Sequence, residues 1–496
     1  MAIIKKVQRL PNVYETGIYF VIWISAVLYS IYNFYLATED YFKHYEDVYG
    51  DFKNGWTVIN RRRDVSDVEW ETICQLLKEL FPWLIVHSAM TEYLKREKIK
   101  HIVQLVLSFM FLLYYTNVAV FLLLVLQPFV FQLFSKFKNI TLIWICCGLC
   151  LLIITIYKFV DNKTLQYVGI TEELHITSII AVFWINLRCL SFYIDKIKME
   201  VNDKITFFDF INFVFYLPTL FCGPFVGYND FKSKNNFRNL TSRTTKLFLN
   251  LLRVLFWFIF TEYCLHYIYI NAISYQVEHI KTFQPWAIYG YGYAMGQFFH
   301  LKYVILYGLS TSFAEFEGVT VPHLPKCIGR IHLYSDMWKY FDVGLYKFLV
   351  KYIYIPTQYS QSYINKLFSS GLCFTFVYVW HGTQNYILIW TVLNFMGISV
   401  EMICKELYKK CFFNFGSKHP NMERRLTSSL ASILLAISAI SNFYFFAGTS
   451  IGNIFFEKLF TGNFSENFIL LFCLYCCCQV SIQVKEWGMR CRALYK

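Results

Sequence analysis

Long apolar segments recur along the whole chain and are separated by short polar ones. About 20 consecutive apolar residues let a helix cross a bilayer. Segments of at least roughly this length occupy 16–37, 102–134, 140–160, 175–194, 205–228, 246–273, 284–311, 363–400, 425–447 and 466–484. Because several could hold two crossings or are broken by charge, we expect about 10 to 12 transmembrane or re-entrant helices. The runs are continuous and do not alternate, so the predicted fold is an all-α polytopic membrane protein.

The composition supports this prediction. The 496 residues are 56% hydrophobic, 20% aromatic and only 16% charged, which is too apolar for an ordinary soluble protein. No linker, low-complexity stretch or repeat divides the sequence, and the longest hydrophilic stretch, 38–70, is too short to be a domain. We therefore expect one membrane-embedded unit over residues 1–496.

The net charge of +13 does not indicate a nucleic-acid partner. Lysine and arginine lie in short segments between the apolar runs, and no compact basic domain is present. Cytoplasmic loops and anionic lipid headgroups account for this distribution better. The predicted partner is membrane lipid.

Two segments differ from the apolar runs. Residues 69–98 carry charge every few positions and a central proline, which is typical of an interfacial or re-entrant helix. Residues 314–362 begin with a polar, proline-containing piece and continue into an amphipathic one, between two spans. Non-spanning backbone at membrane depth is tolerated where it lines a cavity, so this segment is a candidate part of a site.

The 16 cysteines could indicate a metal or redox site. Seven of them fall inside apolar runs, where a free thiol packs as a small hydrophobic group. They form two C-x-x-C spacings without the polar loops of a zinc site. Packing is the predicted role of these residues: Cys146, Cys147, Cys150, Cys473, Cys476, Cys477 and Cys478.

Two ionisable residues are the strongest candidates for chemistry. His381 lies in the apolar stretch FTFVYVWHGTQNYILIW, and Asp342 lies in the amphipathic segment before it. Ionisable groups at membrane depth are unfavourable unless they have a function or a partner. An imidazole can act as a general base, and a carboxylate can hold a substrate group or orient the base. Gly382 leaves space for another group to approach the backbone after the histidine.

Other charged pairs offer alternatives. Glu262 and His266 lie one turn apart on a helix and could form the proton relay of a transporter, or a structural hydrogen-bonded pair. Arg188 and Asp195 share a helix face and could form an ion pair or contact a phosphate. The sequence contains no H-E-x-x-H, P-loop or dinucleotide-binding motif.

Five motifs together resemble the membrane-bound O-acyltransferase family, most closely its branch that acylates Hedgehog proteins. They occur in family order within roughly 180–450: LRCLSFYID, FYLPTLFCGPFVGYNDF, LPKCIGRIHLYSDMWKYFDVGLYKFLVKYIYIP, FVYVWHG and ISNFYFFAG. The resemblance implies a helical bundle around a central tunnel. It also implies a long-chain acyl-CoA donor, palmitoyl-CoA, and transfer to the N-terminal cysteine of the Hedgehog signalling domain.

The resemblance also assigns roles to individual residues. It implies that His381 and Asp342 are catalytic, that Trp338 and Asn442 contact substrate, and that Cys327 ligates the iron of a haem b. Arg330, Lys339, Lys347 and Lys351 are candidates to bind the phosphates of CoA, or else belong to a basic cytoplasmic loop. The family implies a multi-pass protein of the endoplasmic reticulum membrane or the Golgi. The alternative within the fold is an O-acyltransferase acting on a serine of a secreted peptide or on a lipid.

Overall fold

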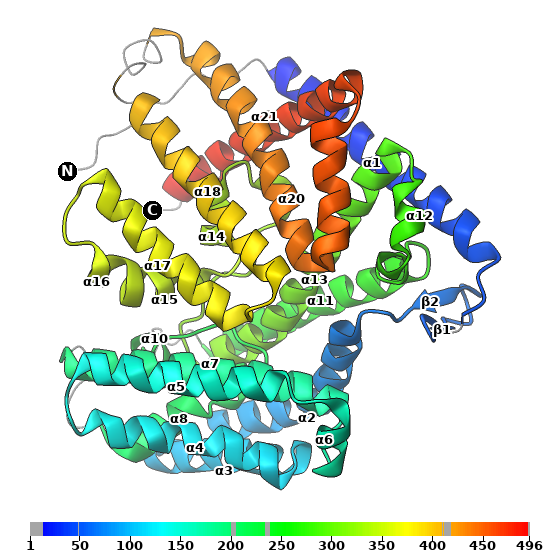
Figure 1. Cartoon of the computed structure of the whole chain (residues 1–496). Helices are drawn as coiled ribbons and strands as arrows, with labels where there is room; N and C mark the ends of the chain where they lie inside the picture. The colour runs from blue at the N-terminus through cyan, green and yellow to red at the C-terminus, as the bar shows by residue number, and fades with distance from the viewer. Residues whose placement is uncertain are drawn as a thin grey trace.

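The computed structural model describes residues 13–47, 49–199, 205–233, 239–408, 410 and 418–494. These residues form helices and one short β-hairpin, and the helices are arranged in an upper and a lower group (Figure 1). Nine of the helices are long and apolar enough to cross a membrane. They are α1 (Val13–Lys43), α3 (Glu97–Tyr115), α4 (Val118–Ser135), α5 (Ile140–Lys158), α7 (Glu172–Ile197), α11 (Leu240–Leu265), α18 (Asn385–Leu407), α20 (Pro420–Thr461) and α21 (Phe464–Leu494).

Three further helices have sufficient length but more polar residues: α2 (Val68–Tyr93), α13 (Pro285–Phe316) and α17 (Tyr363–His381). With the nine candidates they make twelve long helices among the described residues, of which nine are apolar enough to be spans, fewer than the 10 to 12 transmembrane or re-entrant helices predicted. The sequence predicted an interfacial or re-entrant helix for α2. It is a single helix that runs through Pro82 and packs against α3, α7 and α13.

The lower group in Figure 1 contains α2 to α5 with the short helices α6 (Asn162–Tyr167) and α8 (Phe207–Val214), and α7 packs against α4 and α5. Two shorter helices follow α8 along the chain: α9 (Leu217–Leu220) and α10 (Tyr228–Lys232). The upper group contains α17, α18, α20 and α21, and each of these helices packs against the next one along the chain. Helix α1 packs against α21 and α13. The central helix α13 contacts α1, α2, α11 and α20, and side chains are buried along its whole length.

After the end of α13 at Phe316, residues 317–362 contain no helix long enough to span a membrane, which agrees with the prediction that this segment is not a span. They form η2 (Ile328–Arg330), α14 (Tyr334–Tyr340), α15 (Val343–Leu349), the π-helical η3 (Val350–Tyr354) and α16 (Ile355–Thr357). In the long α20, Gly448 has φ +79°, a conformation that glycine adopts without strain, and it divides the helix just after Phe445 and Phe446. Residues of η2, α14 and α15 line the cavity described below, as do Phe445 and Phe446 just before the kink.

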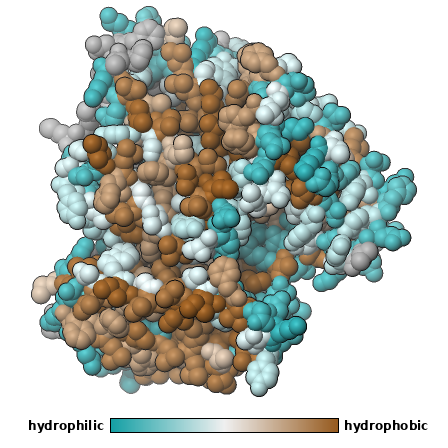
Figure 2. All heavy atoms as spheres, viewed as in Figure 1, coloured by the Kyte–Doolittle hydropathy of each residue, from teal (hydrophilic) through white to brown (hydrophobic). Residues whose placement is uncertain are grey.

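A hairpin of β1 (Phe52–Asn54) and β2 (Arg62–Asp64) covers one end of the bundle. Asp64 Oδ2 accepts the backbone N–H groups of Asn271 and Ala272 at 2.8 and 3.1 Å, which ties the hairpin to η1 (Ala272–Tyr275), just before α12 (Val277–Lys281). Figure 2 shows apolar side chains over the helices and hydrophilic ones on the right, around the hairpin, with a hollow between the two groups. This distribution fits a bilayer around the helices and water at the hairpin.

Candidate active site

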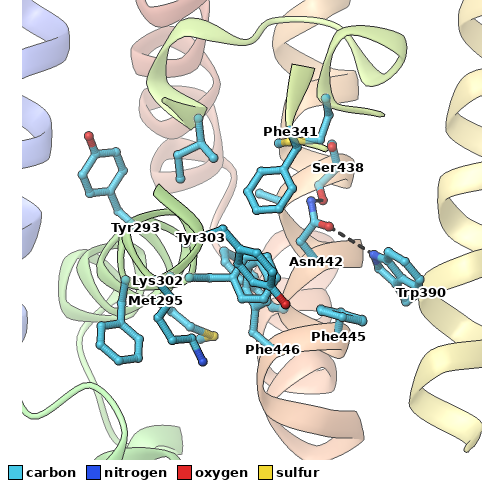
Figure 3. Close-up of a pocket in the computed structure, with 18 of the residues that line it drawn as sticks. Tyr293, Met295, Lys302, Tyr303, Phe341, Trp390, Ser438, Asn442, Phe445 and Phe446 are labelled. Atoms are coloured by element: carbon cyan, nitrogen blue, oxygen red, sulfur yellow. Dashed lines mark hydrogen bonds between the residues drawn. The ribbon is translucent and has the colours of Figure 1, made fainter. Parts of the chain in front are cut away.

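A cavity of about 840 Å³ lies where α1, α7, α13, α17, α18, α20 and α21 converge. Its wall is mostly aromatic and aliphatic, and Figure 3 shows Tyr303, Phe341, Phe445 and Phe446 gathered around it. Small-molecule pockets are typically about 300–1,000 Å³ and mostly apolar, with a few polar groups that orient the ligand. The cavity is therefore large enough for a substrate, and its few polar groups identify the candidate chemistry.

His381 is the last residue of α17 and lines this cavity. Three aromatic rings meet its imidazole edge to face: Trp380, Trp390 and Phe445, with centroid separations of 4.8, 5.3 and 5.2 Å. Among the described residues, no side chain or backbone group forms a hydrogen bond with the imidazole nitrogens. The ring is thus held by aromatic packing, with its proton-accepting atoms left for a substrate.

Asp342 lines the same cavity and is the N-cap of α15. Its Oδ1 accepts the backbone N–H of Leu345 at 2.8 Å, and its Oδ2 accepts the hydroxyl of Tyr307 at 2.7 Å. Burial raises the pKa of the Asp342 carboxyl, and these two hydrogen bonds oppose the rise. Asp342 and His381 share the cavity, but within the described part of the chain no hydrogen bond joins their side chains. The sequence missed Tyr307, because one tyrosine in an aromatic helix carries no distinguishing signal.

Trp338 and Asn442 also line the cavity, each in a separate hydrogen bond. The indole N–H of Trp338 donates to Asn394 Oδ1, and that of Trp390 donates to Asn442 Oδ1, both at 3.1 Å (Figure 3 shows the second bond). The two indole rings lie 5.5 Å apart. Asn442 therefore holds a ring that packs on His381. Asn394 and Trp390 were not predicted, although a buried asparagine in an apolar helix is a signal that could have found Asn394.

Charged side chains occur in the cavity wall near the hairpin. The ammonium of Lys302, on α13, pairs with Asp67 at 2.9 Å and with Glu69 at 2.7 Å. All three residues line the cavity, and only 5% of the Lys302 side chain is exposed. This end of the cavity is consequently polar, whereas the walls around His381 are aromatic.

The other predicted site residues lie outside the cavity wall. Cys327 is a half-buried free thiol whose sulfur is 3.8 Å from the Gln297 amide nitrogen. Lys351 pairs with the buried Asp195 at 2.9 Å, so it takes part in packing. Arg330, Lys339 and Lys347 are exposed. None of these four cations lines the cavity.

The charged pair Arg188 and Asp195 is not an ion pair, so this alternative of the sequence analysis was wrong. Arg188 is fully buried and donates to the backbone oxygens of Val214 and Thr219 at 2.8 and 2.5 Å. Asp195 instead accepts from Lys351 and, at 2.7 Å, from the hydroxyl of Tyr352. The two residues are about two helical turns apart, and each side chain contacts a different element: Arg188 the segment 214–219, Asp195 the η3 helix.

Glu262 and His266 form structural contacts with the hairpin. The Glu262 carboxylate accepts from the Arg63 guanidinium at 2.6 and 2.8 Å and from the Trp70 indole at 2.8 Å. His266 Nε2 accepts the backbone N–H of Trp56 at 2.9 Å, and its Nδ1 lies 2.7 Å from the backbone oxygen of Glu262. Neither residue lines the cavity. These contacts account for both residues without a proton relay.

The comparisons with known proteins agree with this architecture. A family model described as the membrane-bound O-acyltransferase family matches residues 129–446. The chain is 30% identical over 487 residues to "Protein-cysteine N-palmitoyltransferase Rasp" of Drosophila melanogaster, covering 94% of each chain. It is 25% identical over 421 residues to "Protein-cysteine N-palmitoyltransferase HHAT" of Mus musculus, covering 80% of this chain and 83% of the relative. It is also 22% identical over 498 residues to the mouse "HHAT-like protein", covering 95% and 94%.

Proposed function

Because the chain belongs to the membrane-bound O-acyltransferase family and is an acyltransferase, we propose that it transfers palmitate from palmitoyl-CoA to the N-terminal cysteine of the Hedgehog signalling protein. The product is an amide on the α-amino group. One observation carries the proposal: His381 and Asp342 line the same apolar cavity. The two most similar relatives reported above are both named protein-cysteine N-palmitoyltransferases, which supports a protein cysteine as the acceptor.

In the proposed reaction the α-amino nitrogen attacks the thioester carbon, so a C–N bond forms and the C–S bond breaks. An α-amino group has a pKa of about 7.7–8.0, so part of it is already neutral near pH 7. His381 accepts the proton that the nitrogen loses, and this proton then reaches the departing CoA sulfur to give the free thiol. The unbonded imidazole nitrogens at the cavity surface are available for this transfer.

Asp342 holds the amine in this proposal. A carboxylate has about four acceptor positions, and the structure uses one on each oxygen, for Leu345 and Tyr307. The remaining positions can accept the N–H groups of the acceptor. Since no hydrogen bond joins Asp342 to the His381 imidazole among the described residues, this role is better supported than orientation of the imidazole.

The aromatic walls suit the donor. Each buried methylene of an acyl chain contributes about 0.8 kcal/mol, so an apolar wall can hold the chain with its carbonyl beside the base. Trp338 lies in that wall, and the exclusion of water limits hydrolysis of the thioester. Residues of both α1 and α21 line the cavity, which supports treating residues 1–496 as one acyltransferase unit.

Two further expectations remain proposals. Cys327 would hold the iron of a haem through its thiolate, because its sulfur is a free, half-buried thiol with a long contact to Gln297. A haem there would add a redox-active iron outside the cavity, and the proposed acyl transfer does not require it.

We also propose the endoplasmic reticulum membrane or the Golgi as the location, which immunofluorescence against markers of both compartments would test.

The test of the main proposal is transfer of an alkyne-tagged palmitoyl group from its CoA ester to a peptide with the Hedgehog-type N-terminal cysteine. Purified protein should acylate it, whereas His381→Ala protein and an N-terminally acetylated peptide should give no product. Acylation of a seryl peptide instead would assign the O-acyltransferase alternative. If the monodisperse protein acylates neither peptide, the proposed substrate is wrong.

A further inference from the structure

A contact from the other helix group reaches the backbone of His381. The ammonium of Lys158, the last residue of α5, donates to the carbonyl oxygen of His381 at 2.7 Å. The two residues are 223 positions apart in the sequence. Lys158 also lines the cavity, so this bond lies at the candidate active site and not on the outer surface.

The end of α17 explains why this carbonyl needs a donor. The last carbonyl groups of a helix have no partner within the helix, and a cation near that end is favourable. At Gly382 the chain leaves the helix with φ +123°, a conformation that favours glycine. A Cβ at this position would lie 2.9 Å from Lys158 Nζ and 2.5 Å from Gln384 Oε1. The glycine therefore makes the space that the ammonium occupies, as the sequence predicted for an approaching group.

Aromatic contacts place the same helix end on the lower group. Trp380 packs against Phe183 and Trp184 of α7, with ring centroids 5.3 and 5.9 Å apart. Trp144 of α5 meets Phe376 of α17 at 6.1 Å. These contacts hold the side of α17, but ring packing permits sliding along and about the helix axis. The hydrogen bond from Lys158 is directional and acts at the residue whose imidazole must be placed.

We propose that Lys158 is a positioning residue for His381: its ammonium fixes the end of α17 to the lower helix group and so sets the imidazole in register with the substrate. The proposal rests on the proposed role of His381 as the base. A displacement of about 1 Å at a catalytic group can reduce the rate about 100-fold. Losing the bond should therefore lower kcat while leaving the affinity for both substrates unchanged.

The variants are Lys158→Met, which keeps the length and apolar stem, and Lys158→Arg, which keeps the charge and the donors. Lys136→Met is the matched control, because Lys136 follows the end of the neighbouring helix α4 and is exposed. We expect Lys158→Met to lower kcat by about 10- to 100-fold with KM for donor and acceptor within about twofold of wild type. Lys158→Arg should recover most of the activity, and Lys136→Met should match wild type.

Hydrogen–deuterium exchange supplies a readout that is independent of the substrate. The peptide covering 375–385 should exchange faster in Lys158→Met than in wild type and Lys136→Met. Unchanged kcat together with unchanged exchange would overturn the proposal, as would a raised acceptor KM at constant kcat. If the methionine variant is not monodisperse, Lys158→Gln repeats the test. If the wild-type protein has no transfer activity, the proposed function is wrong. The exchange measurement would still decide whether Lys158 holds the end of α17, because it does not depend on the substrate.

Discussion

Tyr307 donates its hydroxyl to Asp342 Oδ2 at 2.7 Å and thereby connects the central helix α13 to the cap of α15. Hydrogen bonds to charged groups contribute about 1.5–3 kcal/mol. Tyr307→Phe removes this bond and keeps the ring. We expect kcat/KM to fall by about tenfold, because the carboxylate loses a group that orients it and stabilises its charge. Steady-state acyl transfer with purified protein would measure the change.

Tyr291→Phe is the control for that variant. Tyr291 lies on the same helix and is fully buried, but its hydroxyl has no hydrogen-bond partner among the described residues. Its removal should leave activity unchanged. Equal losses in both variants would mean that α13 responds to any loss of a tyrosine hydroxyl, and not to the bond with Asp342.

Asp342→Asn tests the carboxylate directly. An amide has one acceptor oxygen, so it cannot receive both Leu345 and Tyr307 on separate oxygens as the aspartate does. It also loses the negative charge that would hold the amine. We expect turnover to fall by about 100-fold or more, with an unchanged elution volume in size-exclusion chromatography. Near-normal turnover would remove Asp342 from the mechanism.

The main features of the fold were predictable because apolar length alone determines what can cross a bilayer. His381 and Asp342 were predicted from motifs, and the structure places both in one cavity. Their partners were not predicted. Tyr307 is one of 38 tyrosines, and Lys158 at the end of an apolar helix looks like an ordinary flanking cation. Such contacts join helices that are distant in sequence, so no local pattern reports them. The ion pair of Arg188 with Asp195, one of two alternatives for these residues, was wrong for the same reason.

Cys327→Ala tests the haem proposal separately from catalysis. Cys327 does not line the cavity, whereas the neighbouring residues Ile328 and Gly329 do. We expect the variant to lose any haem absorbance that co-purifies with the wild-type protein and to keep its acyl-transfer activity. The control is Cys477→Ala, a buried thiol that does line the cavity. Absorbance that survives in the Cys327 variant would place the ligand elsewhere.

Glu262→Ala should affect stability more than chemistry. The Glu262 side chain is 9% exposed and pairs with Arg63, whose side chain is 14% exposed. Removing one partner of a buried ion pair destabilises a protein by about 3–5 kcal/mol when the other charge is left uncompensated. Arg63 keeps its pair with Glu71 at 2.6 Å, so we expect a smaller loss here. We expect a clear fall in the melting temperature, measured by thermal unfolding, with little change in kcat of the folded fraction. The reverse result, a stable protein without activity, would contradict the structural role of Glu262.

Asn394 gives the sharpest test of the aromatic wall. It is 1% exposed, and its side chain accepts from Trp338 while donating to the backbone oxygen of Trp390 and the hydroxyl of Ser441. Asn394→Leu keeps the branching at Cγ but leaves the Trp338 indole N–H without its partner, which costs about 1–3 kcal/mol if the group stays buried. Trp338 should therefore rotate away from its present position. Because Trp338 is proposed to contact the acyl chain, we expect KM for palmitoyl-CoA to rise about tenfold, while KM for the peptide stays constant. A fall in melting temperature with an unchanged donor KM would show that the asparagine serves packing alone.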